Sequence, residues 1–108
     1  MTEKAFIVLH GVIATPPMST EARVEAGTLL RRVQSGETLS MPRSRPMPSI
    51  GKRVHELRIP DGDVTWRVVY RIDPDAVVVG EVFAKKTRKT PKSVVVACQA
   101  RFKAYDAL

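Results

Sequence analysis

Apolar positions along this chain recur with two different periods, and each period predicts a different kind of element. Between residues 19 and 35, apolar residues fall three or four positions apart, which predicts a helix with one buried stripe. The stripe consists of Ala22, Ala26, Leu29, Leu30 and Val33. The helix is predicted to begin at Ser19 or Thr20 and to end near Ser35, with Gly36 as its C-cap.

Shorter apolar segments, rich in β-branched residues, predict strands. Four of them lie at about residues 5–13, 52–59, 64–72 and 76–84. The turn sequences Asp-Gly-Asp at residues 61–63 and Asp-Pro-Asp at residues 73–75 join the last three strands. These three strands are therefore predicted to form an antiparallel meander.

The remaining segments complete a single α+β domain over residues 1–108. Residues 36–51 contain three prolines and are predicted to be mostly loop. A closing helix is predicted over residues 91–105, with Thr90 as its N-cap and Pro91 at its first position. The order is thus an N-terminal strand and helix, a three-stranded meander and a C-terminal helix.

Alternation within a strand assigns its side chains to the two faces of the sheet. Trp66 and Tyr70 lie on one, apolar face with His55 from the preceding strand, whereas Arg67 lies on the other. That second face gathers charged residues, namely Lys52, Glu56, Arg58, Arg67, Glu81 and Lys85. We therefore expect both helices to pack on the apolar face and the charged face to remain an open groove.

The charge of the chain is strongly positive. Lys and Arg number 18 against 11 for Asp and Glu, a formal net charge of +7, of which residues 51–108 contribute +5. A positive field concentrated in one half suggests a polyanion as partner. Aromatic residues make up only 6% of the chain, so binding of single strands by base stacking is the weaker hypothesis.

Much of this charge lies in one segment, residues 83–92, which holds five basic residues and no acid. A predicted strand gives way to a predicted helix there, and the N–H groups of a helix N-terminus also attract anions. Such a place suits a phosphodiester, and the alternative is a charged surface that is merely solvated. The candidate phosphate-binding residues are Lys85, Arg88, Lys89 and Lys92, with Lys52 from the charged face.

The single cysteine and the lack of long apolar runs limit the other possibilities. Cys98 lies in an apolar segment, so we expect a buried thiol, with neither a disulfide nor a Cys-rich zinc site. No apolar run approaches the roughly 18 residues of a membrane span, and the N-terminus lacks a signal-peptide pattern. We expect a cytoplasmic protein that needs no membrane, metal or cofactor.

Six short segments in a fixed order carry a family likeness. They are residues 23–27 (Arg-Val-Glu-Ala-Gly), 32–36 (Arg-Val-Gln-Ser-Gly), 46–51 (Pro-Met-Pro-Ser-Ile-Gly), 56–58 (Glu-Leu-Arg), 66–70 (Trp-Arg-Val-Val-Tyr) and 83–91. Together they resemble the RelE/HigB-type toxins, and most of all the phage-derived toxin-like branch. The resemblance covers nearly the whole chain. It implies a small α+β fold with helices on one sheet face and messenger RNA handled on the other.

The resemblance also implies an activity and partners. Such toxins typically cleave messenger RNA in the ribosomal A site and are neutralised by a small antitoxin, in this branch usually a helix-turn-helix protein. The implied partners are therefore a cognate antitoxin, the ribosome and mRNA. Arg67 matches the arginine that holds the scissile phosphate, and Lys85 and Lys86 occupy the region of a second catalytic arginine. The essential tyrosine of RelE has no counterpart in this sequence.

A metal-independent endoribonuclease needs three groups: a base for the 2′-hydroxyl, cations for the charge on phosphorus and an acid for the leaving oxygen. Arg67 and Arg58 suit the cationic role, because a guanidinium grips phosphate with two N–H groups and keeps its proton. Glu56 is the candidate base and Lys86 the candidate acid. The alternative for Glu56 is an ion-paired spacer. We expect the guanidinium of Arg67 to be free on the open face.

Three functions fit these residues. The first is a ribosome-dependent mRNA endonuclease that inhibits translation, which Arg67 and the basic segment favour. The second is a ParE-like toxin of the same superfamily, which poisons DNA gyrase without nuclease activity. The third is an inactive relic that binds RNA or an antitoxin. The missing tyrosine keeps the second and third open.

Overall fold

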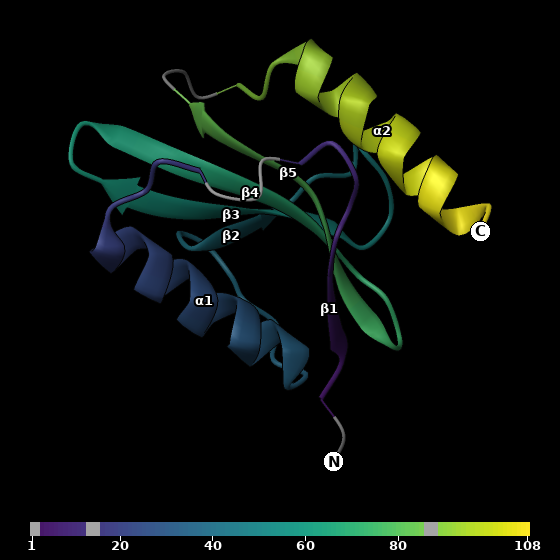
Figure 1. Cartoon of the computed structure of the whole chain (residues 1–108), viewed down its shortest axis with the longest axis horizontal. Coiled ribbons are helices and arrows are strands. Elements are labelled where there is room, and N and C mark those ends of the chain that lie inside the picture. Colours follow the sequence, from purple (N-terminus) through teal and green to yellow (C-terminus); the bar gives the residue numbers. More distant parts are fainter. Residues whose placement is uncertain (1–2, 13–15, 86–88) are drawn as a thin grey trace.

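The computed structural model describes residues 3–12, 16–85 and 89–108. Its elements, in chain order, are β1 (Ala5–Val8), α1 (Thr20–Gln34), β2 (Ser44–Pro46), β3 (Val54–Asp61), β4 (Val64–Ile72), β5 (Ala76–Lys85) and α2 (Lys92–Asp106) (Figure 1). The α+β class, the N-terminal strand and helix and the C-terminal helix are as predicted.

The strands form one mixed sheet in the order β1-β5-β4-β3-β2. β3, β4 and β5 pair antiparallel, which confirms the predicted meander. β1 joins the other side of β5 in parallel, with Ala5 opposite Ala76. β1 and β2 therefore form the two edges of the sheet.

The extent predicted for the first strand was wrong. β1 ends at Val8 rather than at residue 13, because the chain turns there, with Gly11 at a φ of +93°. The proline-rich segment is mostly loop as predicted, but it also contains the short strand β2, which was not predicted and which pairs antiparallel with β3. Pro46 lacks an N–H donor, and an edge strand tolerates it because its outer side needs no ladder bond.

Helix α1 forms as its sequence predicts. The side chain of Ser19 caps the helix by accepting the N–H of Ala22 at 3.1 Å, and all five stripe residues are buried. The N–H of Ser19 itself donates to the carboxylate of Asp61 at 2.9 Å, and Trp66 Nε1 donates to the same carboxylate at 3.1 Å. The start of α1 is thereby fixed to the turn between β3 and β4.

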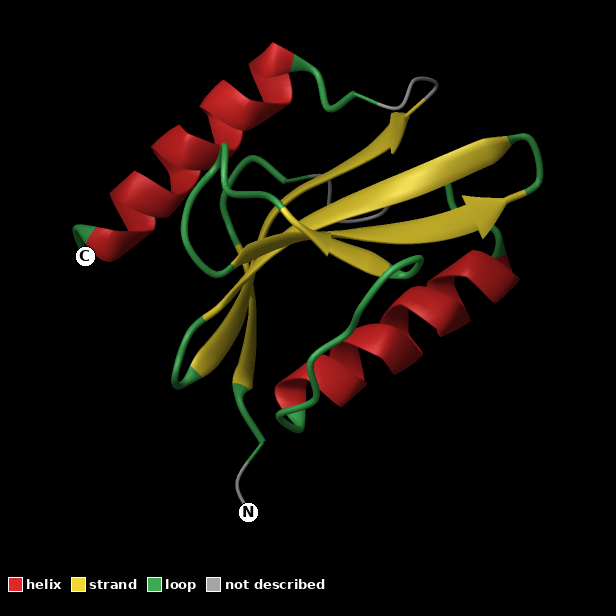
Figure 2. Cartoon of the chain, turned by 180° about the vertical axis from the view of Figure 1, so that it is seen from behind, coloured by secondary structure: helices red, strands yellow, loops and turns green. Residues whose placement is uncertain are grey.

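The two helices lie on opposite faces of the sheet, so the prediction that both share one face was wrong (Figures 1 and 2). Helix α1 covers the apolar face, where it packs against Trp66 and Tyr70. Helix α2 packs Phe102 against the other face, over Val69 and Val78. The reason is that alternation gives this face buried valines as well as charges, and α2 has an apolar side to bury there.

Close packing and charge hold α2 in this place. Gly80 of β5 faces Phe102, and a Cβ at Gly80 would come within 2.8 Å of the ring. At the other end of the helix, Arg71 donates to Asp106 at 2.7 and 2.9 Å and to Asp73 at 2.8 Å. These hydrogen bonds raise the pKa of Arg71 and lower that of Asp106. The second face is therefore part core and part charged surface.

Candidate functional site

A fully buried carboxylate lies at the centre of the charged part of the second face. Glu56 of β3 has 0% exposure. Its Oε1 lies 3.2 Å from a guanidinium nitrogen of Arg67 and 3.2 Å from one of Arg45, and its Oε2 accepts the hydroxyl of Thr90 at 2.8 Å. A buried charge is tolerated when it is paired and hydrogen-bonded in this way. We call these four residues the Glu56 network.

Arg67 occupies the predicted face, but the expectation that its guanidinium is free and open was wrong. The residue is only 4% exposed and its NH1 donates to Glu56 at 3.2 Å. Burial lowers the pKa of Arg67, with Arg58 and Arg45 adding to the effect and Glu56 opposing it. Among the described residues, none accepts a hydrogen bond from the buried Nε of Arg67. The alternative of an ion-paired Glu56 is the one that the geometry supports.

Thr90 does not cap α2 as predicted. Pro91 takes the N-cap position and makes no side-chain cap hydrogen bond. The Thr90 hydroxyl instead donates to Glu56. The hydroxyl oxygen of Thr90 also accepts from Arg45 NH2 at 3.4 Å. The buried carboxylate competes successfully for this hydroxyl because a buried acceptor without its donor is costly.

Arg45 is the functional candidate that sequence reasoning missed. It lies on β2 directly opposite Glu56 in the register, so the two side chains share a face. Its side chain is 31% exposed, whereas that of Glu56 is buried, so it connects the network to the surface. The sequence did not point to Arg45 because residues 36–51 were predicted to be mostly loop. Without a predicted strand there was no pairing register that would place Arg45 opposite Glu56.

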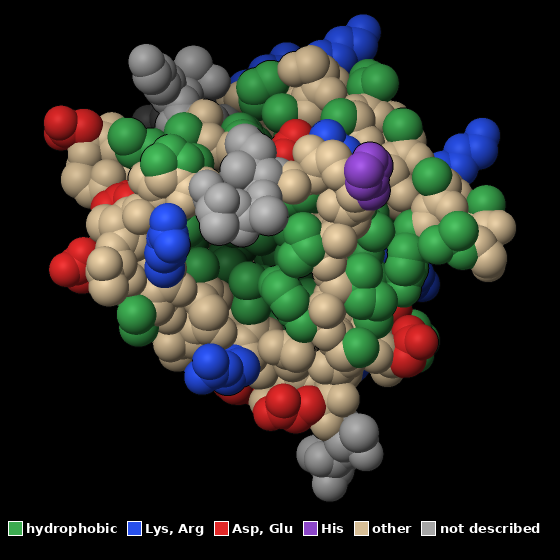
Figure 3. All heavy atoms as spheres, in the orientation of Figure 1, with side chains coloured by type: hydrophobic (Ala, Val, Ile, Leu, Met, Phe, Trp, Pro, Cys, Tyr) green, Lys and Arg blue, Asp and Glu red, His purple; other side chains and the backbone are tan. Residues whose placement is uncertain are grey.

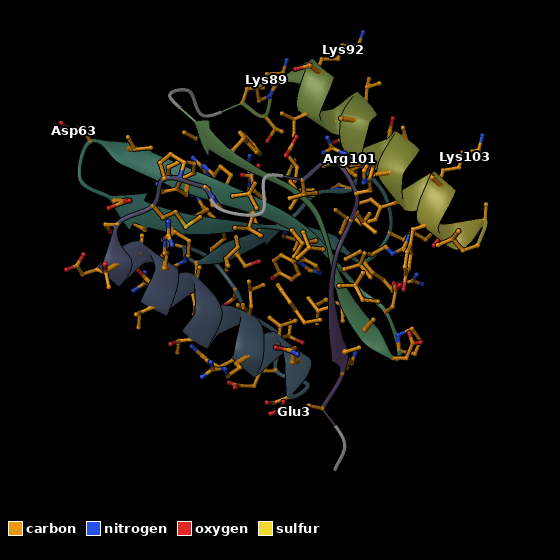
Figure 4. All side chains as sticks on the ribbon, viewed as in Figure 1. Glu3, Asp63, Lys89, Lys92, Arg101 and Lys103 are labelled. Carbon is orange, nitrogen blue, oxygen red and sulfur yellow. The ribbon has the colours of Figure 1, made fainter. Side chains whose placement is uncertain are left out.

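A hollow of about 380 Å³ opens above the network. Its lining includes Arg45, Thr90, Lys89 and Lys92, with Met47, Ser49 and Val95. Lys89 and Lys92 stand at the N-terminal end of α2, as Figure 4 shows, and both are exposed. This basic hollow therefore combines cationic side chains with a helix N-terminus, which favours anions.

The other candidate residues lie elsewhere or outside the described part. Arg58 is opposite Arg67 in the register and lines a smaller hollow of about 200 Å³. Lys52 lines a different hollow, beside Arg71 and Lys103 near the far end of α2. Lys86 and Arg88 lie outside the described residues, as does the side chain of Lys85.

His55 and Tyr70 lie on the apolar face as predicted. Their rings stack with centroids 5.5 Å apart, and burial lowers the pKa of His55. Tyr70 is 1% exposed and its hydroxyl lies 2.6 Å from Ser44 Oγ. Both side chains are on the face opposite Glu56, so neither belongs to the basic hollow. Cys98, on the buried side of α2, is fully buried as expected.

The arrangement can bind a phosphate, with a half-exposed arginine and two lysines at the surface and a buried arginine beneath them. The fold is that of a small α+β protein with a basic surface between a sheet edge and a helix N-terminus. The chain belongs to a toxin-like family of RelE/HigB type: the family model described as "Phage derived protein Gp49-like (DUF891)" matches residues 17–103. No curated protein was found to match the chain.

The helices of the described residues, α1 and α2, both lack the length and apolar character that crossing a bilayer requires. Membership of the family is consistent with a toxin of a toxin–antitoxin pair and suggests an antitoxin as partner.

Proposed function

We propose that this protein is the toxin of a toxin–antitoxin pair and acts as a ribosome-dependent mRNA endoribonuclease. The observation that carries the proposal is the basic hollow over the Glu56 network, in a chain whose family is toxin-like. Several surface cations around one hollow suit a polyanion better than a small neutral substrate.

The residues divide into two groups by exposure. Arg45, Lys89 and Lys92 reach the surface and contact the RNA phosphates. Arg67 lies beneath them and contributes positive charge to the scissile phosphate, since cationic stabilisation is strongest where water is excluded. Glu56 is a positioning residue that aligns Arg45 and Arg67 from below, because a carboxylate with 0% exposure does not reach a 2′-hydroxyl.

Cleavage proceeds by attack of the RNA 2′-oxygen on the adjacent phosphorus, and the proton of the 2′-hydroxyl passes to water. The bond from phosphorus to the 5′-oxygen breaks, a 2′,3′-cyclic phosphate forms, and the leaving 5′-oxygen takes a proton. Lys86 is our candidate for that proton, and Lys85, Arg88 and Arg58 extend the phosphate-binding surface. The ribosome supplies what this chain lacks as a nuclease, including the alignment of the 2′-oxygen for attack.

Primer extension on one mRNA, incubated with the protein in the presence and in the absence of ribosomes, tests the proposal. We expect cuts only when ribosomes are present, and loss of those cuts in Arg45→Ala. Arg32→Ala is the matched control, because Arg32 is on α1, on the other side of the sheet, and pairs only with Glu37 among the described side chains. Equal cutting of naked RNA contradicts the ribosome requirement.

One observation favours a second function, a toxin that binds its target without cutting. Arg67 and Glu56 neutralise each other in a buried pair, which removes both from direct contact with a substrate. A ParE-like gyrase poison needs no such groups at its surface. If the protein arrests growth, leaves mRNA intact with ribosomes present and inhibits gyrase supercoiling, this second function replaces the first.

A further inference from the structure

A second polar hollow lies near the C-terminal end of α2, away from the basic hollow. It measures about 410 Å³, which is within the range of sites that enclose a small molecule. Its walls come from the turn before β3, from Arg71 of β4 and from the C-terminal half of α2. Among the described residues, the two hollows have no lining residue in common. We call the second one the α2-end hollow.

Three exposed cations surround the α2-end hollow. Lys52 and Lys103 have no ion-pair partner among the described side chains. Arg53 is 59% exposed and reaches Asp73 only at 3.4 Å. Figure 3 shows Lys and Arg side chains that project into solvent along α2, and Figure 4 labels Lys103 toward the C-terminal end of that helix. These three cations are therefore available to an anionic ligand.

The other charged groups of the hollow are paired with one another. Arg71 bonds to Asp73 at 2.8 Å and to Asp106 at 2.7 Å, so the two acids and this arginine largely neutralise each other. The positive charge of the three exposed cations remains in excess. The carboxylate of Asp106 is still 56% exposed and keeps acceptor positions for a hydroxyl donor.

The hollow also has an apolar wall and an oriented amide. Ile50, Val54 and Phe102 supply the apolar surface. Gln99 donates its Nε2 to the carbonyl of Ser49 at 2.9 Å, which orients its amide. Its Oε1 accepts no hydrogen bond from the described residues. An apolar surface beside a free amide oxygen suits a flat ring that carries N–H groups.

The backbone at Arg53 is strained. Its φ of +61° lies in the left-handed region, which residues other than glycine rarely adopt. The side chain is mostly in solvent, so packing within the described chain does not offset the cost of this conformation. Strained residues of this kind cluster at binding sites. The strain therefore points to a use of the Arg53 guanidinium at the hollow.

We propose that the α2-end hollow binds a nucleotide. Its phosphate groups contact Lys52, Arg53 and Lys103, and its base lies on the apolar wall, where an N–H of the base donates to the amide oxygen of Gln99. The ribose hydroxyls donate to the carboxylate of Asp106, as they do to acidic residues in other nucleotide sites. This site goes beyond the proposed function and does not depend on it.

A nucleotide fits this hollow better than an RNA strand does. The C-terminal end of a helix carries partial negative charge, and Asp106 adds to it, so a continuous row of phosphates is repelled there. A nucleotide places its phosphates at the turn of Lys52 and Arg53 and its hydroxyl donors at the helix end. A purely apolar ligand makes no use of the three cations.

A titration of the ¹⁵N-labelled full chain, without ribosomes, tests the proposal. The probes are ADP, GDP, adenosine, pyrophosphate and a short single-stranded RNA. We expect ADP or GDP to shift the amide signals of Gly51, Lys52 and Lys103 and to bind at least tenfold more tightly than adenosine or pyrophosphate. The proposal is overturned if neither nucleotide shifts these signals, if pyrophosphate binds as tightly, or if the RNA binds these residues more tightly than both nucleotides.

Two variants locate the site. Arg53→Gly removes the cation and keeps the turn, because glycine readily adopts a φ of +61°. It should weaken nucleotide binding at least fivefold without lowering the Tm of the free chain. Lys52→Glu with Lys103→Glu should weaken binding at least tenfold. Arg31→Glu is the control, because it reverses an exposed charge on α1, on the other face of the sheet.

The outcomes separate this proposal from the proposed function. An Arg53→Gly chain with a lowered Tm and undiminished nucleotide binding would show that the arginine serves the turn alone, which overturns its role. Equal weakening by Arg31→Glu would show that binding follows net charge rather than this hollow. Failure of the chain to cut mRNA on ribosomes bears on the proposed function only, because the titration contains no ribosome.

Discussion

Two arginines four residues apart on the same face of β4 have opposite surroundings. Arg71 is 7% exposed and donates four hydrogen bonds of 2.7–2.9 Å to two carboxylates, with its guanidinium 4.9 Å from the ring centroid of Phe102. Arg67 is 4% exposed, donates to Glu56 at 3.2 Å and has Arg58 and Arg45 nearby. Carboxylates raise the pKa of Arg71, whereas burial lowers that of Arg67.

The difference separates an arginine whose nitrogens all donate within the fold from one whose buried Nε has no acceptor among the described residues. The hydrogen-bonding groups of Arg71 are used within the fold, where they attach the end of α2 to the sheet. Arg67 shares its carboxylate with Arg45 and Thr90. In the Glu56 network two guanidinium groups share one carboxylate, whereas Arg71 alone pairs with two carboxylates. The same residue type thus has two different environments on one strand.

The largest effect is expected for loss of Arg71. Arg71→Ala removes the cation that attaches Asp106 at the end of α2 to the sheet, and it leaves the buried Asp73 without its main cation. Breaking a buried ion pair costs about 3–5 kcal/mol, so the free energy of unfolding should fall by about that amount. Urea unfolding followed by circular dichroism measures it. Arg53→Ala is the control, because Arg53 is 59% exposed at 3.4 Å from Asp73 and should cost under about 1 kcal/mol.

Loss of Arg67 should affect activity more than the fold. Arg67→Ala is expected to lower the rate of ribosome-dependent cutting by about 10²–10³. The free energy of unfolding should fall by only about 1–3 kcal/mol, because Glu56 keeps Arg45 and Thr90 as partners. Arg67→Lys should recover part of the activity, since a point charge does not reproduce the guanidinium fork. Single-turnover cutting assays and urea unfolding, run on the same preparations, check both values.

The double variant Glu56→Gln with Arg67→Met separates the two effects further. It removes both buried charges, so its stability should lie closer to that of the original chain than the stability of Arg67→Ala does. Its cutting activity should stay as low. Full activity in either variant would show that the charge of Arg67 has no part in the reaction.

A smaller effect is expected at Thr90. Thr90→Val removes the hydroxyl that donates to Glu56 while preserving the shape of the side chain, and should lower the free energy of unfolding by about 1 kcal/mol. Thr90→Ser keeps the hydroxyl and serves as the matched control. If both substitutions have the same effect in urea unfolding, the hydrogen bond does not stabilise the network.

The smallest effect concerns acid stability at Asp106. Its hydrogen bonds to Arg71 lower the pKa of its carboxyl below the ordinary value of 3.8. A lowered folded pKa gives stability that is present above the unfolded pKa and is lost as the pH falls through the folded pKa. Asp106→Asn should therefore flatten the dependence of unfolding free energy on pH below about 3.8. A dependence as steep as that of the original chain would show that the attachment does not respond to this titration.

The sequence predicted the parts of the fold that depend on local pattern. The stripe of α1, its start near Ser19 and the meander follow from spacing and turn residues within a few positions. The placement of α2 depends instead on which face of β5 is open to Phe102, and that requires Gly80 and the buried valines to be seen together. The hydrophobic period alone does not choose the face.

The candidate site was predicted by composition and resemblance more than by geometry. The alternation of β3 and β4 correctly placed Glu56 and Arg67 on one face. It gave no depth, because burial of that face depends on Thr90 and Arg45, which come from a segment 34 residues later and from a short edge strand. The sequence can therefore predict that Glu56 and Arg67 share a face. It cannot predict that Arg45 and Thr90 complete a buried network with them, because that depends on the three-dimensional fold.

The carboxylate of Asp61 accepts hydrogen bonds from the Ser19 amide and the Trp66 indole. We therefore expect the β3–β4 turn and the start of α1 to open together in local unfolding. The amide hydrogen of Ser19 is bonded to Asp61, 42 positions away in the sequence. It is therefore expected to exchange with solvent only when the turn and the start of the helix separate. Its exchange rate in native-state hydrogen–deuterium experiments thus reports on the tip of the hairpin. The amides of α2, fixed by Arg71 and Phe102 on the other face, report on a second and separate opening.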